Sequence, residues 1–385
     1  MVRHRDAERA SIDGLGRNRG CRRCGRGGRC AAGVSRTGCE SQQHDNKNGD
    51  QPDKWDAAGT SIGAGGDGHG IGLYAEPVLS KDQAVTSPLK VRIGIGLGTL
   101  TTAGTPDRFN HFVDRLEELG FDSLWMSERI GSTAPDPLIA LAVAAGRTEK
   151  LKLGTSVLVL PGRNPVLLAK ELATLDVLSN GRLLPAVGLG SAEAAEHRAF
   201  GVQRAERGRR HDEALALMRA CWTGELISHE GEFYPVTDVQ VLPRPMKGDL
   251  EVWLGGIAPS ELRRVGRVGD GWLPSFCSPD DIVGAMPVIE EAATAAGRSI
   301  DPQHIGALIP YCDGELPSQI IELVKRRRPD MDPRRVIPTR AQLPKLIGEF
   351  VAVGASKFVV LPLVGDADPD VELGALADEL LPLET

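Results

Sequence analysis

The sequence has few aromatic residues, no long hydrophobic run and no excess of positive charge. Phe, Tyr and Trp make up only 4% of the 385 residues, so a core must be built from Leu, Val, Ala and Ile, which the hydrophobic share of 41% allows. The absence of a run of about 18 apolar residues excludes a transmembrane helix, and the polar N-terminus lacks the apolar region of a secretory signal. The net charge of −7 argues against a nucleic-acid-binding surface. We therefore expect a cytoplasmic protein that binds neither membrane nor nucleic acid.

Sequence motifs of several enzyme classes are also missing. The eight histidines are scattered and show no HExxH, HxH or His–carboxylate spacing, so we expect no metal site. Neither a GxSxG motif nor a P-loop is present. A metal-dependent hydrolase, a serine hydrolase of this motif type and a P-loop NTPase therefore have little support.

Residues 1–88 differ in character from the rest of the chain. Arginines alternate there with Gly, Ser, Asp and Asn, and without apolar periodicity such a segment cannot bury enough surface to offset its ordering entropy. Cys21 and Cys24 have metal-ligand spacing, and Cys30 and Cys39 could complete four thiolates, but a second CxxC pair is missing. We interpret residues 1–88 as a disordered extension, or as sequence upstream of the true start. A small zinc site that contacts nucleic acid is the alternative.

In residues 89–385, short apolar runs alternate with amphipathic stretches, which is the order that produces a parallel sheet. We predict strands near 91–97, 122–126, 151–158, 183–188, 251–254, 271–274, 304–309 and 357–361. We predict helices near 106–119, 136–146, 165–178, 205–222, 259–268, 280–297, 340–353 and 370–380. Eight strand–helix alternations predict a closed (β/α)8 barrel, and an open doubly wound sheet is the alternative fold.

Two stretches interrupt this alternation. Residues 224–234 have the pattern of a hairpin whose turn is Glu230-Gly231, and residues 310–338 form a polar excursion that contains the basic run Lys325–Arg328. Three further cysteines lie far apart in this region and are expected to be reduced thiols: Cys221, Cys277 and Cys312.

Several segments of residues 90–365 resemble the luciferase-like monooxygenase family, including its branch that depends on the deazaflavin coenzyme F420. They follow the family's order and are Leu119–Arg129, Leu153–Val157, Asn164–Asp176, Ser179–Gly190, Glu206–Trp222, Gly231–Tyr234, Pro243–Pro245 and Leu254–Trp272. Each segment is a weak signal, whereas the ordered set is specific. The resemblance implies an oxidoreductase of the bacterial luciferase-like (β/α)8 type with a deazaflavin or flavin at the barrel mouth.

The resemblance also implies which residues bind the cofactor. In the family, a cis peptide bond, here between Ser156 and Val157, bulges against the cofactor ring. Gly188 and Gly190 close the predicted fourth strand and let the backbone approach a ligand without an intervening Cβ.

A second cofactor contact is expected where the segment after the predicted fifth strand enters a helix. Backbone N–H groups at a helix N-terminus bind anions, and the family binds the cofactor phosphate with these amides. We expect Gly256, Ile257 and Ala258 to contribute them, while Gly255 allows the turn.

The sequence departs from the family's dehydrogenases at two positions. Where those enzymes place a histidine after an acidic residue at the end of strand two, Arg129 follows Glu128; a guanidinium is always charged and cannot act as a general base. Where relatives carry a carboxylate after the strand-four glycines, Ser191 is present. A glucose-6-phosphate or simple alcohol dehydrogenase is therefore disfavoured. We expect Ser127, Glu128 and Arg129 to orient and polarise the substrate as catalytic residues.

Our first hypothesis is an oxidoreductase that transfers a hydride between coenzyme F420 and a small organic substrate. The alternative on the same fold is a monooxygenase that uses reduced FMN and dioxygen. A third hypothesis, from another class, is a non-enzymatic binding protein whose N-terminal segment contacts zinc or nucleic acid. Because relatives are often dimers, we also expect a homodimer.

Overall fold

The computed structural model describes residues 88–98, 104–191, 193–363 and 368–385. The predicted extension of residues 1–88, with its four cysteines, lies outside the described residues apart from Pro88, so its interpretation stays a prediction. The described cysteines Cys221, Cys277 and Cys312 are buried free thiols.

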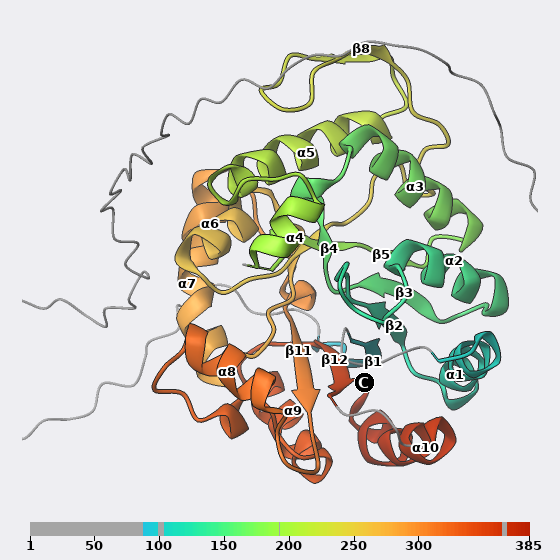
Figure 1. The fold of residues 1–385 in the computed structure, drawn as a ribbon, viewed down its shortest axis with the longest axis vertical. Coiled ribbons are helices and arrows are strands. Elements are labelled where there is room, and N and C mark those ends of the chain that lie inside the picture. Colours follow the sequence, from blue (N-terminus) through green and yellow to red (C-terminus); the bar gives the residue numbers. More distant parts are fainter. Residues whose placement is uncertain (1–87, 99–103, 192, 364–367) are drawn as a thin grey trace, which may run out of the picture. The chain divides into compact units, whose positions relative to one another are not determined.

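Parallel strands form the centre of the domain, and helices surround them (Figure 1). The barrel strands are β1 (Arg92–Leu97), β2 (Ser123–Met126), β3 (Lys152–Thr155), β4 (Leu158–Val159), β5 (Leu183–Leu184), β6 (Ala186–Gly188), β9 (Trp253–Leu254), β10 (Gly271–Trp272), β11 (Gly306–Tyr311) and β12 (Lys357–Pro362). The helices are α1 (Pro106–Leu119), α2 (Pro137–Arg147), α3 (Pro165–Leu178), α4 (Ala194–Ala199), α5 (Arg207–Trp222), α6 (Pro259–Val268), α7 (Pro279–Ala295), α8 (Ser318–Arg327), α9 (Leu343–Ala352) and α10 (Pro369–Leu380).

The strand order closes on itself, which confirms the predicted (β/α)8 barrel. One sheet runs β11-β12-β1-β2-β3-β5 and the other β10-β9-β6-β4. The two sheets join where β3 continues into β4 and β5 into β6, and on the other side through single parallel bridges from Trp272 to Ile305 and from Ser275 to Leu308. The predicted third and fourth strands are therefore each divided into two short strands.

Helix-capping residues explain why several helices begin where the sequence predicts. Asn164 caps α3 because its side chain accepts hydrogen bonds from the backbone N–H groups of Val166 and Leu167, and Pro165 occupies the first helical position. Thr105 caps α1 in the same way, through the N–H of Arg108.

The structure corrects the predictions for the two interruptions. The hairpin pairs β7 (Ile227–His229) with β8 (Val236–Val239), so its second strand starts beyond Tyr234, where we predicted that the hairpin would end. The polar excursion contains the helix α8, which buries Ile320 and Val324 one turn apart. None of the helices within the described ranges is long and apolar enough to cross a membrane.

Two tryptophans fill the barrel interior. Trp125 and Trp253 belong to an interior cluster with Ala186, Leu273, Leu308, Val359 and Leu361. Glycines leave room for the indoles: a Cβ added at Gly154 would lie 2.3 Å from the ring of Trp125. The indole Nε1 of Trp125 donates a hydrogen bond of 2.8 Å to the hydroxyl of Ser123. A core with few aromatic residues thus places two of its largest side chains inside the barrel.

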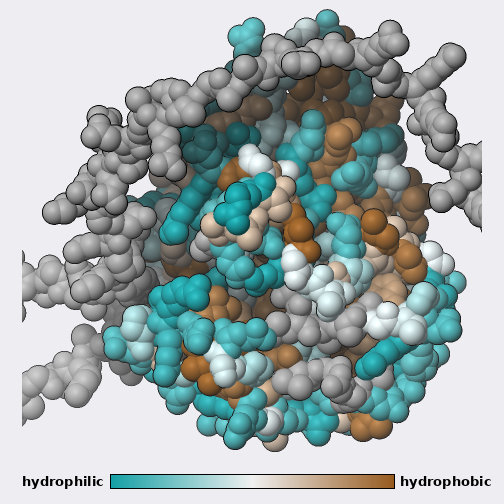
Figure 2. Space-filling view, viewed as in Figure 1, coloured by the Kyte–Doolittle hydropathy of each residue, from teal (hydrophilic) through white to brown (hydrophobic). Residues whose placement is uncertain are grey.

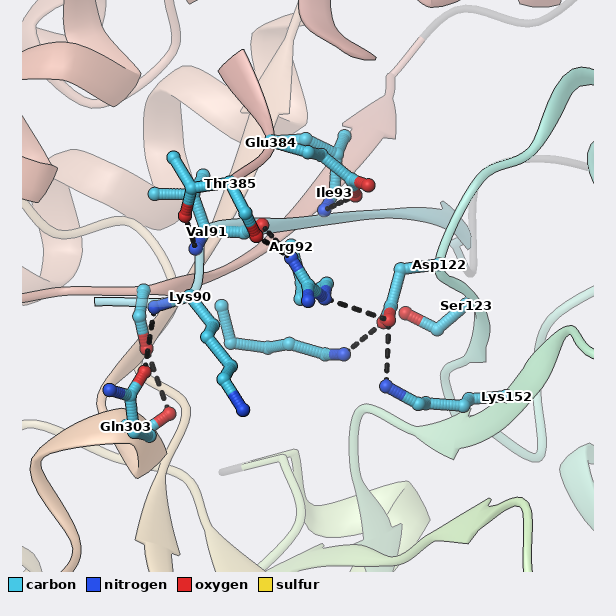
Figure 3. A network of polar contacts seen from close by, with 12 residues as sticks. Lys90, Val91, Arg92, Ile93, Asp122, Ser123, Lys152, Gln303, Glu384 and Thr385 are labelled. Carbon is cyan, nitrogen blue, oxygen red and sulfur yellow. Dashed lines mark hydrogen bonds and ion pairs between the residues drawn. The ribbon is translucent and has the colours of Figure 1, made fainter. Parts of the chain in front are cut away.

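A buried polar cluster lies where the barrel strands begin (Figure 3). Asp122 accepts a hydrogen bond of 2.7 Å from Lys152 Nζ and forms an ion pair with the buried Lys357. Burial alone would raise the pKa of Asp122, but Lys357 and Lys152 lower it overall. Burial lowers the pKa of Lys357 to about 8. This end of a (β/α)8 barrel contributes to stability, so we assign the cluster no part in catalysis.

The last residues of the chain bind to the first strand beside this cluster (Figure 3). The N–H of Ile93 donates to Glu384 Oε1 at 2.6 Å, and the N–H of Val91 donates to Thr385 Oγ1 at 3.1 Å. Their contacts add to the pairing of β1 with β12.

Candidate functional site

Three predicted cofactor-binding residues meet at the C-terminal mouth of the barrel. Val157 is half-buried and packs on the interior cluster. A Cβ added at Gly188 would lie 2.8 Å from Val157 Cγ2, and one added at Gly255 would lie 3.3 Å from Val157 Cγ1. The Val157 side chain therefore fits between the two glycines, of which Gly188 ends β6 and Gly255 follows β9. The peptide bond between Ser156 and Val157 is cis, as the family resemblance implies.

Ser127 lies beside this segment, at the end of β2. Its hydroxyl donates a hydrogen bond of 3.0 Å to the carbonyl oxygen of Ser156 and lies 3.2 Å from the Ser156 hydroxyl. The structure thus brings Ser127 and Ser156 together, with the Ser127 hydroxyl directed at the peptide group that precedes Val157.

Glu128 is bound on both carboxylate oxygens. Its Oε2 accepts a hydrogen bond of 2.6 Å from the N–H of Val159, and its Oε1 pairs with the guanidinium of Arg163. The Glu128 side chain is only 8% exposed and that of Arg163 is 19% exposed. Burial alone would lower the pKa of Arg163, but hydrogen bonding to Glu128 raises it overall. Glu128 is therefore tied to the backbone of the 156–159 segment rather than free to bind a substrate.

Arg129 pairs with Glu193 instead of its neighbour Glu128. The pair joins the loop after β2 to the residue before α4, and both side chains are more than a third exposed. A second contact runs parallel to it, because the N–H of Gly131 donates to Glu196 Oε1 at 3.3 Å. The loop after β2 and the loop after β6 are thus held together across one side of the mouth, by residues that sequence reasoning did not link.

The amides at the start of α6 already bind an anionic group. Gly256 has a φ of 98°, a conformation that favours glycine, and it turns the chain into the helix. The N–H groups of Ile257 and Ala258 both donate to Glu261 Oε2, at 3.1 and 3.0 Å. Two of the three predicted phosphate-binding amides therefore converge on one oxygen, but this oxygen belongs to a side chain of the same helix.

Gly190 lies in the loop after β6, which the Arg207 side chain reaches. Arg207 Nη1 lies 3.1 Å from the carbonyl oxygen of Ser191 and 3.3 Å from that of Gly190. Burial lowers the pKa of Arg207. A hollow with about 230 Å³ of free space, part of it open to solvent, lies beside this loop, and His197 and Phe200 contribute to its wall.

Two other residues of the segments that resemble the family, Trp272 and Asp212, have structural roles. Trp272 is fully buried, and its indole N–H donates to the carbonyl oxygen of Gly256 at 2.8 Å. Asp212 pairs with Arg264 at 2.5 Å and with Arg267 at 2.7 Å, so these ion pairs join α5 to α6.

The arrangement favours a flat ligand with an anionic arm. Glycines and Val157 form an uncharged surface at the mouth. The amides at the start of α6 are placed to donate to one anionic oxygen, as they do to the Glu261 carboxylate. Within the described ranges, no group of three or more His, Cys, Asp or Glu side chains is placed to hold a metal ion. The uncharged surface beside Val157 and the paired amides of Ile257 and Ala258 fit an organic cofactor that carries a phosphate.

Comparison with known families agrees with this geometry. Residues 90–342, well over half of the chain, match the family described as luciferase-like monooxygenase. Among curated proteins, the chain is 32% identical over 206 residues to the F420-dependent glucose-6-phosphate dehydrogenase of Kineococcus radiotolerans, a match that covers 50% of this chain and 60% of that protein. It is 31% identical over 222 residues to the phthiodiolone/phenolphthiodiolone dimycocerosates ketoreductase of Mycobacterium tuberculosis, covering 50% of this chain and 58% of that protein. The chain thus spans about three fifths of the length of the curated relatives it matches.

Solved structures share the fold at lower identity. A monooxygenase from Streptomyces bottropensis superposes with a TM-score of 0.63 at 23% identity, covering 76% of this chain and 99% of that one. The coenzyme F420-dependent tetrahydromethanopterin reductase of Methanopyrus kandleri superposes with a TM-score of 0.62 at 22% identity, covering 77% and 100%. One architecture thus occurs both in a monooxygenase and in an F420-dependent reductase.

Proposed function

The chain belongs to the luciferase-like monooxygenase family, and from this membership we propose that it is an oxidoreductase that transfers a hydride between coenzyme F420 and a small organic substrate. The observation that carries the proposal is the contact of Val157 with Gly188 and Gly255 at the barrel mouth. Curated relatives whose names state dependence on F420 favour this cofactor over FMN.

Coenzyme F420 when bound would supply the ring carbon that accepts or donates the hydride. Ser156, Val157, Gly188 and Gly190 would position its ring at the mouth. The turn at Gly255 and Gly256 and the amides of Ile257 and Ala258 would bind its phosphate, since an anionic oxygen already fits between these amides.

The residues at the end of β2 would act on the substrate in different ways. The Arg129 side chain is 36% exposed and always charged, so it would bind a carboxylate or phosphate, or polarise a substrate oxygen. The Ser127 hydroxyl would provide a second polar contact. Glu128 would act indirectly as a positioning residue, because its carboxylate holds Val159 and Arg163. The substrate would then be a small molecule with an oxygen function, the class that the names of the curated dehydrogenase and ketoreductase relatives also indicate.

A binding titration of the purified protein with F420 and with FMN, followed by fluorescence, tests the proposal. Micromolar or tighter binding of F420 with much weaker binding of FMN is the expected result, and it would justify a search for the substrate. The reverse preference would move the protein to the monooxygenases that use reduced FMN and dioxygen. Binding of neither cofactor would overturn the proposal.

We also propose a cytoplasmic homodimer that forms through α2 and α3. Their outer faces expose Ile139, Leu167 and Leu178, whose exposed fractions are 69%, 61% and 73%, and Figure 2 shows hydrophobic side chains on the side of the barrel where these helices lie. Exposed apolar side chains that gather on one side of a protein mark association sites. Size-exclusion chromatography with light scattering tests this assignment: wild type should elute as a dimer and the Leu178→Lys variant as a monomer, whereas a monomeric wild type would refute it.

A further inference from the structure

Three carboxylates lie where the loop after β2 meets the loop after β6 and α4: Glu128, Glu193 and Glu196. Glu128 is bound on both oxygens and only 8% exposed. Glu196 is also buried and accepts the N–H of Gly131. The Glu193 side chain, in contrast, is 50% exposed. Two of the carboxylates therefore belong to the packed wall of the mouth, and the third lies at its surface.

A single side-chain contact holds Glu193 in place. Its carboxylate pairs with the guanidinium of Arg129 and forms no other ion pair or hydrogen bond with a residue that the structure describes. Although Glu193 is the N-cap residue of α4, its side chain accepts no hydrogen bond from that helix. Exposed ion pairs contribute little to stability. Glu193 can therefore leave Arg129 at small cost, while Glu196 keeps α4 attached to the loop after β2.

Arg129 follows directly on residues that contact the surface where we place the cofactor. The N–H of Glu128 donates to the carbonyl oxygen of Val157 at 3.4 Å, and the Ser127 hydroxyl donates to that of Ser156 at 3.0 Å. These contacts place the backbone of Arg129 beside the Val157 surface. A guanidinium presents parallel N–H donors that match the two oxygens of a carboxylate. A substrate with a carboxylate can therefore replace the partner that Arg129 has now.

The charges around Arg129 favour a carboxylate over a phosphate. Arg163 is already paired with Glu128 and with Asp136, so its charge is compensated. The buried Glu196 adds a negative charge to the same wall. A phosphate monoester carries close to two negative charges at neutral pH, and it would be repelled by that carboxylate more strongly than a singly charged group.

We propose that Glu193 is a specificity-determining residue, which occupies Arg129 in the free protein and gives it up to a substrate that carries a carboxylate. An uncharged molecule offers no counter-charge and so leaves the ion pair in place. The inference rests on the proposed function for the reaction that the bound acid undergoes, and it narrows the substrates of that reaction to organic acids.

The exchange predicts opposite effects for two substitutions. Glu193→Gln removes the competing carboxylate and should tighten the binding of acetate about three- to fivefold, the range that an exposed ion pair contributes. Arg129→Gln should weaken acetate binding about tenfold or more, because the charged donor is lost.

Asp114→Asn is the matched control. It frees Arg147 from an ion pair between α1 and α2 in which both side chains are 36% exposed. Because this pair is on the outer helices and not beside the barrel mouth, acetate should bind at Arg147 at least tenfold more weakly than at Arg129 of Glu193→Gln.

The experiment titrates the full chain at pH 8 and constant ionic strength with acetate, with its uncharged analogue acetamide and with inorganic phosphate. NMR follows the amide resonances of Ile130 and Gly131, which adjoin Arg129, and that of Arg147 in the control. F420 is titrated into the wild type in parallel. We expect both effects for acetate, weaker binding of phosphate than of acetate, and no change in acetamide affinity between wild type and Glu193→Gln.

The outcomes separate this inference from the proposed function. If Glu193→Gln binds acetate no more tightly than wild type, or if acetate binds Arg147 of the control as tightly, the exchange is refuted whether or not F420 binds. Tighter binding of phosphate than of acetate would refute the assignment to organic acids. If acetate shows both effects but F420 does not bind, the carboxylate site stands and the proposed function fails.

Discussion

Glu128 Oε2 accepts a hydrogen bond of 2.6 Å from the backbone N–H of Val159, so the end of β2 is tied to the segment that contains Val157. The same carboxylate pairs with Arg163, and little of either side chain reaches solvent. The residue that occupies an expected catalytic position thus holds the wall against which we place the cofactor.

Replacing Glu128 with Gln should lower the free energy of unfolding by about 2–3 kcal/mol, because the buried guanidinium of Arg163 keeps only Asp136, at 3.5 Å, as a partner. Chemical denaturation measures the change. Arg129→Gln is the contrasting variant, since it breaks an exposed pair and should cost at most about 0.5 kcal/mol. Equal losses of stability in the two variants would contradict the inference that the buried Glu128 carboxylate stabilises the fold more than the exposed Arg129 pair does.

The buried cluster at the start of the strands predicts a dependence of stability on acid pH. The pKa of Asp122 is lowered in the folded state, so its contribution is fully present above its ordinary value of 3.8 and is lost as the pH falls through the lower folded value. Unfolding curves recorded below pH 4 should therefore show a steeper loss of stability for wild type than for Asp122→Asn.

At neutral pH the Asp122→Asn variant should be less stable by about 3 kcal/mol, because Lys357 and Lys152 lose their counter-charge. Parallel acid curves for the two proteins would show that the Asp122 carboxylate is not held by these lysines.

Gly154→Ala should destabilise the barrel by about 3 kcal/mol, because the added methyl would overlap the Trp125 indole in the interior. Gly146→Ala in α2 is the matched control. A Cβ there has no neighbour within 4 Å, so this change should stabilise the protein by about 0.5–1 kcal/mol. Thermal denaturation compares the two, and a Gly154→Ala variant as stable as wild type would show that the indole can move aside.

Gly188→Ala should weaken F420 binding about tenfold, because its methyl would push Val157 out of its place at the mouth. Adding Val157→Ala should restore part of the affinity by removing the overlapping branch. Fluorescence titration of the single and double variants gives the coupling between the two positions. Additive effects would mean that Gly188 and Val157 do not share a binding surface.

The sequence predicts most accurately the helix boundaries that local signals determine. α1, α3 and α6 have the predicted bounds because a proline occupies the first helical position of each, and Thr105 and Asn164 provide side-chain caps for the first two. In contrast, the sequence predicts only a polar excursion where α8 lies, because Ile320 and Val324 provide only a short apolar stripe among charged residues.

The charged side chains of the site form their contacts with residues that are distant in sequence. Arg163 lies 35 positions from Glu128, and Glu193 lies 64 positions from Arg129, so no local pattern could assign these partners. Glu261 could have been found from its position three residues after the helix cap, but the cap is Ala258 rather than the Ser or Thr that marks such a motif. The family resemblance identifies the backbone segments of the site. The partners of the charged side chains around these segments can be assigned only from the structure.

The pairing of β1 with β12 has a consequence for how the chain acquires its structure. Arg92 pairs with Lys357 across most of the domain, so the barrel cannot close until its last strand has formed. Contacts between residues so far apart slow folding, and a partly folded barrel leaves β1 as an open edge that can pair with another chain. We therefore expect the yield of native protein during refolding to fall as the protein concentration rises. The losses should come from molecules in which β1 pairs with another chain before β12 has paired with it.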